Sequence, residues 1–160
     1  MGSKSYYENA ISNRSREEVK VTTAEMDAIV NDHFNYEAND DLEGVMSTLA
    51  EGASHEIIPG PYGALTDPRR IREFYTKLYT ELTGDSVTPV RRLYGGGFVV
   101  DETIWHGHLA DKGSFLSGNR SGETDLRLLH IFDLRDGKIV KEQAWWDLGL
   151  VQRHLGCTIT

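Results

Sequence analysis

The sequence predicts an α+β fold in which the helices come first and the strands last. Apolar residues recur at helical spacing in three segments between residues 22 and 84, with one short strand among them, and then at strand spacing up to residue 147. Helices followed by strands that hairpins connect argue against alternating β-α units. A long curved antiparallel sheet around a helix leaves an open mouth, which suits a small apolar ligand. We therefore expect a cone-shaped α+β barrel with three N-terminal helices packed in a curved antiparallel sheet.

The first two helices are marked by their ends. Thr22 and Glu25 have the spacing of a capping box, in which each residue satisfies a backbone N–H of the other. Apolar residues then follow on one helical face until an Asn-Asp-Asp run at 39–41 interrupts it. A second short amphipathic helix starts at Leu42, and Gly52 is expected to close it.

The third helix begins at Asp67 and Pro68, because Asp caps a helix and proline at the first helical position loses no needed N–H. Gly84 is expected to end it. The strands are predicted at residues 55–58, 86–94, 97–108, 124–134 and 138–147. Residues 110–123 form a long polar connection of the kind that often serves as a lid or binding loop.

Size and composition indicate one globular domain. The chain has 160 residues, of which 39% are hydrophobic and 26% charged. We assign residues 1–20 to a polar N-terminal arm and residues 21–160 to the domain. No apolar run approaches the length of a membrane span, and the first thirty residues carry no secretory pattern. Cys157 is the only cysteine, so no intrachain disulfide can form, and a cytoplasmic location is expected.

The net charge of the chain limits the kinds of partner that it is expected to bind. The formal net charge is −8, and the basic residues come in pairs rather than in stripes, which argues against nucleic acid and against an anionic membrane surface. The expected ligand is a small apolar molecule. A homodimer is expected as well, because a sheet of this shape leaves an apolar outer face that must be covered. Trp146 and alternate residues of the last two strands are placed on that face.

Three motifs resemble those of a known family. They are the helix at 67–74, the hairpin at 132–142 with its Asp-Gly-Lys-Ile core, and the C-terminal segments 145–150 and 152–156. Together they resemble the NTF2-like superfamily and, within it, the SnoaL-like polyketide cyclase group, over about residues 22–156. The C-terminal motif departs from the family pattern, since it has two more residues between its Gln and its Leu.

The resemblance implies a cofactor-independent cyclase or isomerase that works by acid/base catalysis. Its substrate would be a small, mostly apolar carbonyl compound such as a polyketide or terpenoid intermediate, and no metal or cofactor would take part. A carboxylate of the last strand would remove a proton from a carbon flanked by carbonyl groups. Two alternatives stay open: an epoxide hydrolase or dehydratase of the same fold, and a non-catalytic module for small-ligand binding or dimerisation.

Asp147 occupies the position that matches the family's carboxylate. It ends a Trp-rich strand, where a low dielectric would raise the pKa of a carboxyl group and make proton transfer possible near neutral pH. The alternative is a helix N-cap, for which Asp is also favoured. Strand alternation places Gln143 and Trp145 on the face of Asp147, and Glu142 and Trp146 on the opposite face. Glu142 is therefore expected at a surface or an interface.

Histidines supply the other candidate catalytic groups. His55, His130 and His106 are the candidates, each with a packed core histidine as the alternative. The candidate substrate-binding residues are His33, Tyr36, Tyr62, Trp105, Trp145 and Phe98. His106 and His108 share one strand face and could bind a metal ion with a third ligand from His130 or Asp147. Because the family implied by the motifs works without metals, no metal site is expected.

Overall fold

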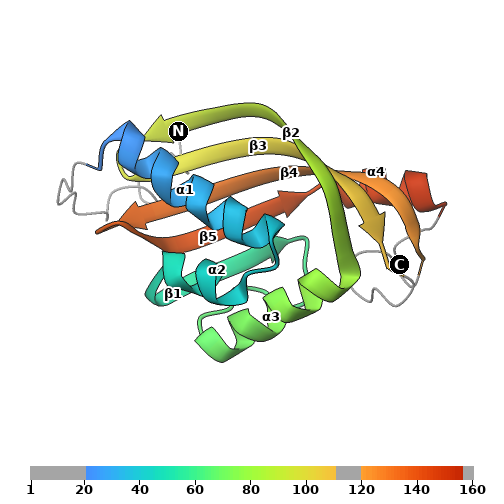
Figure 1. The fold of residues 1–160 in the computed structure, drawn as a ribbon, viewed down its shortest axis with the longest axis horizontal. Coiled ribbons are helices and arrows are strands. Elements are labelled where there is room, and N and C mark those ends of the chain that lie inside the picture. The colour runs from blue at the N-terminus through green and yellow to red at the C-terminus, as the bar shows by residue number, and fades with distance from the viewer. Residues whose placement is uncertain (1–20, 111–119, 157–160) are drawn as a thin grey trace, which may run out of the picture.

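A curved five-stranded sheet organises the computed structural model, which describes residues 21–110 and 120–156 (Figure 1). The helices are α1 (Thr23–Ala38), α2 (Leu42–Thr48), α3 (Pro68–Glu81) and α4 (Leu148–Leu155). The strands are β1 (Leu49–Ile58), β2 (Leu82–Gly95), β3 (Phe98–Leu109), β4 (Gly122–Arg135) and β5 (Lys138–Trp146). Their order in the sheet is β1-β5-β4-β3-β2. The α+β class and the three helices before the long strands are confirmed.

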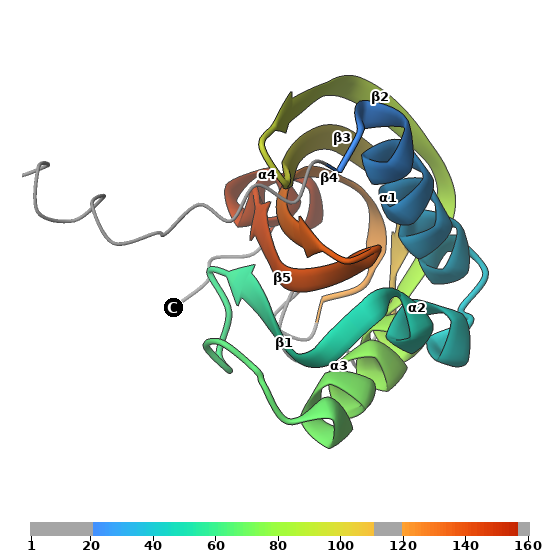
Figure 2. The same cartoon turned by 90° about the vertical axis from the view of Figure 1, so that its left-hand side faces the viewer.

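Helices α1, α2 and α3 pack on one face of the sheet, and Figure 2 shows how the sheet curls beside them. One apolar cluster joins Met26 and Val30 of α1 to Phe132 of β4. The other joins Phe74 of α3 to Trp146 of β5. Side chains that alternate with these along the strands face away from the helices. Trp146 is 8% exposed in the second cluster, so its expected place on the outer face is wrong.

The predicted helix starts are confirmed at the level of hydrogen bonds. The Thr22 side chain accepts from the Glu25 backbone N at 3.2 Å, and the Glu25 carboxylate accepts from the Thr22 backbone N at 2.8 Å. Asp67 accepts from the Arg69 backbone N at 2.9 Å, with Pro68 at the first helical position. These caps satisfy N–H groups that have no partner inside the helix.

Two glycines that were expected to end helices lie inside strands. Helix α2 ends at Thr48, and Gly52 lies in β1 with φ +71°, where the pairing with β5 shifts register. Gly84 lies in β2, three residues after α3. A Cβ atom at Gly84 would come within 2.8 Å of the Trp105 indole nitrogen, so close packing of an aromatic ring explains this glycine.

The sheet also differs from the purely antiparallel prediction, because its edge strand β1 pairs with β5 in parallel. The other three pairings are antiparallel. None of the helices in the described part of the chain combines the length and apolar character needed to span a membrane. The predicted arm at 1–20, most of the polar connection at 110–123, and Cys157 lie outside the described residues.

Candidate functional site

Glu142 of β5 is a buried carboxylate on the helix-facing side of the sheet. It is 1% exposed and pairs in register with His55 of β1 and with Phe132 of β4. It lies on the same strand face as the buried Ala144 and Trp146, opposite to Asp147, as the alternation predicts. The expected surface position of Glu142 is wrong, because this face is the one that the helices cover.

Three side chains from three other elements contact this carboxylate. The Nε2 atom of His33, on α1, lies 3.3 Å from Glu142 Oε2. Tyr75, on α3, donates its hydroxyl proton to the same oxygen at 3.1 Å. The Nε2 atom of His55 lies 3.8 Å from it. All four side chains are almost inaccessible to solvent. A buried charge is tolerated only where it is paired and hydrogen-bonded, and this arrangement meets that condition.

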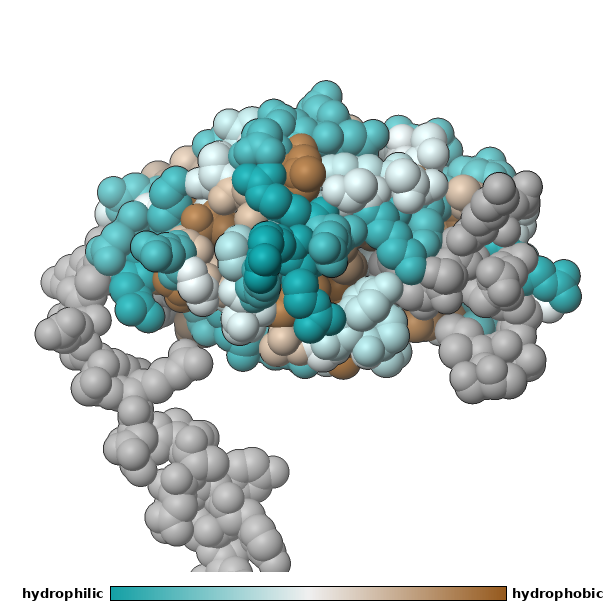
Figure 3. All heavy atoms as spheres, turned by 90° about the horizontal axis from the view of Figure 1, so that it is seen from below, coloured by the Kyte–Doolittle hydropathy of each residue, from teal (hydrophilic) through white to brown (hydrophobic). Residues whose placement is uncertain are grey.

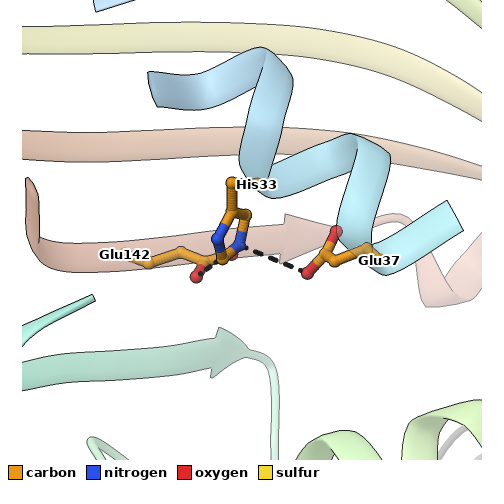
Figure 4. Close-up of side chains that lie close together, drawn as sticks. All are labelled: His33, Glu37 and Glu142. Atoms are coloured by element: carbon orange, nitrogen blue, oxygen red, sulfur yellow. Dashed lines mark ion pairs between the residues drawn. The ribbon is translucent and has the colours of Figure 1, made fainter. Parts of the chain in front are cut away.

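His33 carries a proton on both ring nitrogens. The Thr48 hydroxyl donates to the Val45 carbonyl oxygen at 2.6 Å, so it accepts from His33 Nδ1 at 2.7 Å. Nε2 lies between two carboxylates, Glu142 at 3.3 Å and Glu37 at 3.4 Å (Figure 4). Burial alone would lower the pKa of His33, but the charges of Glu142 and Glu37 outweigh it and raise the pKa to about 10.

The positive charge of His33 in turn shifts the pKa of Glu142. Burial opposes its ionisation, but the charge of His33 and the hydrogen bond from His33 hold the pKa of this carboxyl well below its usual range. Burial and the charge of Glu142 raise the pKa of the Tyr75 hydroxyl well above its usual value. At neutral pH the cluster therefore contains a carboxylate, an imidazolium and a neutral phenol.

His55 is the member of this cluster that reaches a cavity. Its Nδ1 atom is buried and has no hydrogen-bond partner among the described residues. A void of about 10 Å³ lies against the ring, close to the smallest volume that holds one water molecule. The void is lined by His55, Ile57, Gly60, Pro61, Tyr62, Gly63, Leu65 and Phe74. Burial lowers the pKa of His55, which keeps the ring neutral at pH 7.

A larger hollow lies next to this void. It has a volume of about 230 Å³ and shares Tyr62, Leu65 and Phe74 with the void. Arg70, Glu73 and Lys77 of α3 complete its lining. Figure 3 views the molecule from below, the side where Figure 1 shows α3, and there small apolar patches lie among mostly hydrophilic side chains. The two spaces therefore adjoin at Tyr62, Leu65 and Phe74.

His130 lies deeper on the same sheet face, as its predicted alternation with Leu128 and Phe132 requires. Its ring stacks on Phe132 and meets the edge of Phe34. Its Nδ1 has no partner among the described residues, and burial lowers its pKa. It is therefore a neutral, packed histidine beside the cluster.

Asp147 lies outside the cluster. Its side chain is exposed and accepts a hydrogen bond from the Leu150 backbone N at 3.0 Å, which makes it the N-cap of α4. The strand ends at Trp146, so the next residue starts the helix and its carboxyl group satisfies that helix. Asp147 is therefore the helix N-cap that the sequence offered as the alternative to catalysis. A catalytic role for Asp147 stays a prediction.

Three more candidates lie on the sheet face away from the helices. His106 Nδ1 lies 2.7 Å from Asp125 Oδ1, and its Nε2 lies 2.9 Å from the Thr88 hydroxyl. Phe98 is 40% exposed. Trp145 alternates with the buried Ala144 and Trp146. The fold does not bring these three side chains to the void beside His55.

The remaining aromatic candidates lie on the helix-facing side. Tyr36 of α1 packs so closely on α2 that a Cβ atom at Gly44 would overlap its ring. Trp105 is half-buried against the core beside α3. Tyr62 lines both the void and the hollow, and its hydroxyl accepts from Lys77 Nζ at 3.3 Å. Of the three, Tyr62 alone lines the void beside His55.

Within the described ranges, one group has a spacing that could hold a metal ion. Its members are His33, Glu37 and Glu142, whose ligand atoms all lie within 4.8 Å of one another. The same spacing fits an imidazolium shared by two carboxylates. The group considered from the sequence, His106 and His108 with His130 or Asp147, does not have this spacing in the described part of the chain. His106 and His130 lie on opposite faces of the sheet.

Comparison with known families agrees with this architecture. Residues 30–142 match the SnoaL-like domain family. The chain belongs to this family. No curated protein matches the sequence significantly. The resemblance found in the three sequence motifs is therefore confirmed.

Solved structures show the same fold for this SnoaL-like domain. A candidate isomerase from Bacillus subtilis superposes with a TM-score of 0.70 at 16% identity, covering 85% of this chain and 96% of that one. A candidate SnoaL-like polyketide cyclase from Shewanella putrefaciens CN-32 gives 0.70 at 10% identity, with 85% and 98% covered. An LEH-like epoxide hydrolase from M. tuberculosis gives 0.64 at 16% identity, with 82% and 90% covered. The cone-shaped fold is thereby confirmed, and the different chemistries named for these proteins leave the reaction open.

Proposed function

We propose that this SnoaL-like domain is a cofactor-independent acid/base enzyme, a cyclase or isomerase, for a small and mostly apolar carbonyl compound such as a polyketide or terpenoid intermediate. The observation that carries this proposal is the buried Glu142 carboxylate, paired with His33 and Tyr75, behind a neutral His55 that faces a cavity. Proteins with this fold that are named as a candidate isomerase and a candidate cyclase support the class of reaction.

In this proposal His55 is the general base. With its proton on Nε2, toward the Glu142 carboxylate, His55 keeps a lone pair on Nδ1, the ring nitrogen without a partner among the described residues. Nδ1 takes a proton from a carbon next to a carbonyl group, and the electron pair of that C–H bond moves to the carbonyl oxygen. The charge of Glu142 stabilises the imidazolium that forms. The proton then returns to another carbon in an isomerisation, or to the new alkoxide in a ring closure.

Tyr62 is assigned to the enolate oxygen. It supplies the one hydroxyl group in the lining of the void, and its oxygen already accepts from Lys77, which polarises the O–H bond. A donor aimed at the developing negative charge lowers the barrier of such a step. A substrate larger than water enters only if the loop between β1 and α3 shifts. Residues 59–66 of this loop are exposed except for Leu65.

One observation favours a second candidate function. The void beside His55 has about the volume of one water molecule, so the same base could activate water for attack on an epoxide. The epoxide hydrolase of similar fold is consistent with this reading. Incorporation of oxygen from labelled water into the product separates hydrolysis from cyclisation or isomerisation.

The test measures hydrogen–deuterium exchange next to the carbonyl of simple cyclic ketones in D₂O by NMR. The native protein is expected to accelerate this exchange, His55→Gln to abolish the acceleration, and Asp147→Asn to retain it. Retained exchange in His55→Gln, or its loss in Asp147→Asn, would move the base to Asp147. Binding of the ketones without any accelerated exchange would instead favour the non-catalytic module.

A further inference from the structure

Glu37 links the buried cluster to solvent. The His33 side chain is 0% exposed and that of Glu142 is 1% exposed, whereas the Glu37 side chain is 23% exposed. Tyr75, His55 and His130, which face the pair from α3, β1 and β4, are buried as well. The hydroxyl of Tyr79, a further α3 group in the field of Glu142 and Glu37, is also buried. Of the charged groups that approach His33 in the described part of the chain, Glu37 therefore has the greatest access to water.

The geometry offers the His33 proton two carboxylate acceptors. The Tyr75 hydroxyl oxygen also lies 3.4 Å from Nε2, but it donates its own proton to Glu142. Nε2 lies 3.3 Å from Glu142 Oε2 and 3.4 Å from Glu37 Oε1, which are nearly equal distances on the two sides of the ring edge (Figure 4). Glu37 stands one helical turn after His33 on α1, at i+4, so the backbone holds the two side chains on one face. The Nδ1 proton is committed to Thr48, which leaves the Nε2 proton as the one that can move.

We infer that Glu37 is the group through which the buried His33–Glu142 pair exchanges protons with water. The Nε2 proton passes to Glu37 Oε1 and leaves a neutral His33 whose Nδ1–H still donates to Thr48. The protonated carboxyl group then gives this proton to a water molecule, and the reverse steps restore the imidazolium. No other bond forms or breaks.

The inference bears on catalysis only if the proposed function holds. The charge of His33 keeps Glu142 ionised, and ionised Glu142 stabilises the His55 imidazolium in the proposed reaction. Glu37 would then set how fast the pair regains its proton after a change of pH or a turnover. It is a positioning residue in this scheme, since it does not line the void beside His55.

The experiment follows exchange of the His33 Nε2 proton with water by NMR of ¹⁵N-histidine-labelled protein, together with the pKa of the ring. Glu37→Gln keeps the size of the side chain and removes its proton acceptor. The pKa of His33 is expected to fall by about one unit or more, as for the loss of one nearby opposite charge. A purely electrostatic role would then speed exchange, because the proton is held less tightly. The proposed role predicts slower exchange despite the lower pKa.

Two further variants make the result decisive. Asp32→Asn removes the same charge from an exposed position of α1 and is expected to leave exchange unchanged. Glu37→Asp keeps a titratable group and is expected to restore exchange in part. Unchanged or faster exchange in Glu37→Gln, or equal slowing in Asp32→Asn, overturns the inference. The readout needs no substrate, so a failure of the ketone test leaves this result standing.

Discussion

Raising the pH above neutrality is expected to destabilise the folded domain through His33. The folded-state pKa of His33 is about 10, against an ordinary value of 6.5. Its contribution to stability is complete below the unfolded pKa and is lost as the pH rises through the folded pKa. Between these values the folded state holds one proton more than the unfolded state, so the free energy of unfolding falls by roughly 1.4 kcal/mol per pH unit. About two pH units above 7.5 should therefore cost about 3 kcal/mol.

The assay is chemical denaturation of the native protein and of His33→Gln at several pH values. The pKa values of His55 and His130 are lowered in the folded state, so these residues increase the free energy of unfolding as the pH rises through their unfolded pKa. Above about pH 7.5 they are neutral in both states and do not change how stability depends on pH. His33→Gln should lose the slope. It should also lose about 3–5 kcal/mol at neutral pH, because Glu142 keeps a buried charge without its imidazolium. His108→Gln removes a histidine that is 46% exposed and serves as the control, which should keep the slope.

The refuting result is equal slopes for the native protein and His33→Gln, which would show that the buried pair does not hold the extra proton. If His33→Gln fails to fold, an NMR titration of His33 in the native protein decides the point. A ring that loses its proton near pH 6.5 would refute the ion pair.

Three other substitutions test the site by denaturation and NMR. Tyr75→Phe removes the donor to Glu142 and should cost about 1.5–3 kcal/mol, whereas Tyr79→Phe removes a buried hydroxyl without a partner in the described chain and should be neutral or stabilising. Equal effects of the two changes would contradict the contact. Thr48→Val removes the acceptor of the His33 Nδ1–H, so it should lower the free energy of unfolding by about 1–3 kcal/mol and lower the pKa of His33. An unchanged pKa of His33 would argue against that hydrogen bond. Asp147→Ala should cost about 1 kcal/mol of stability as a lost cap and leave ketone exchange intact, and lost exchange would return the catalytic role to Asp147.

Local rules were enough to predict most of the helices, because caps act within one turn. Thr22, Glu25 and Asp67 make the bonds that their spacing indicates. The same rules predicted that Gly52 and Gly84 end helices, and both predictions were wrong. Gly52 lies at a shift in the register between β1 and β5, and Gly84 allows the close approach of Trp105. Both are tertiary features, which a local sequence pattern does not predict.

The site was harder to predict because alternation along a strand separates two faces without saying which one is covered. Trp145 and Trp146 are adjacent and equally apolar, so β5 offered an aromatic residue on either face. Asp147 could face the pocket only if Trp145, on the same strand face, were covered by the helices. The structure buries Trp146 instead, and Glu142 is buried with it.

A signal for the buried cluster was nevertheless present in the sequence. His33 interrupts the apolar face of its helix, and His55 shares a strand face with the apolar Ile57. A polar group on a covered face must find a partner, and a partner for a buried histidine is most stable when it is charged. The covered His33 of the helix therefore predicts a carboxylate on a covered face nearby. Glu142 meets this expectation, since it shares its strand face with Ala144 and lies in the strand next to that of His55.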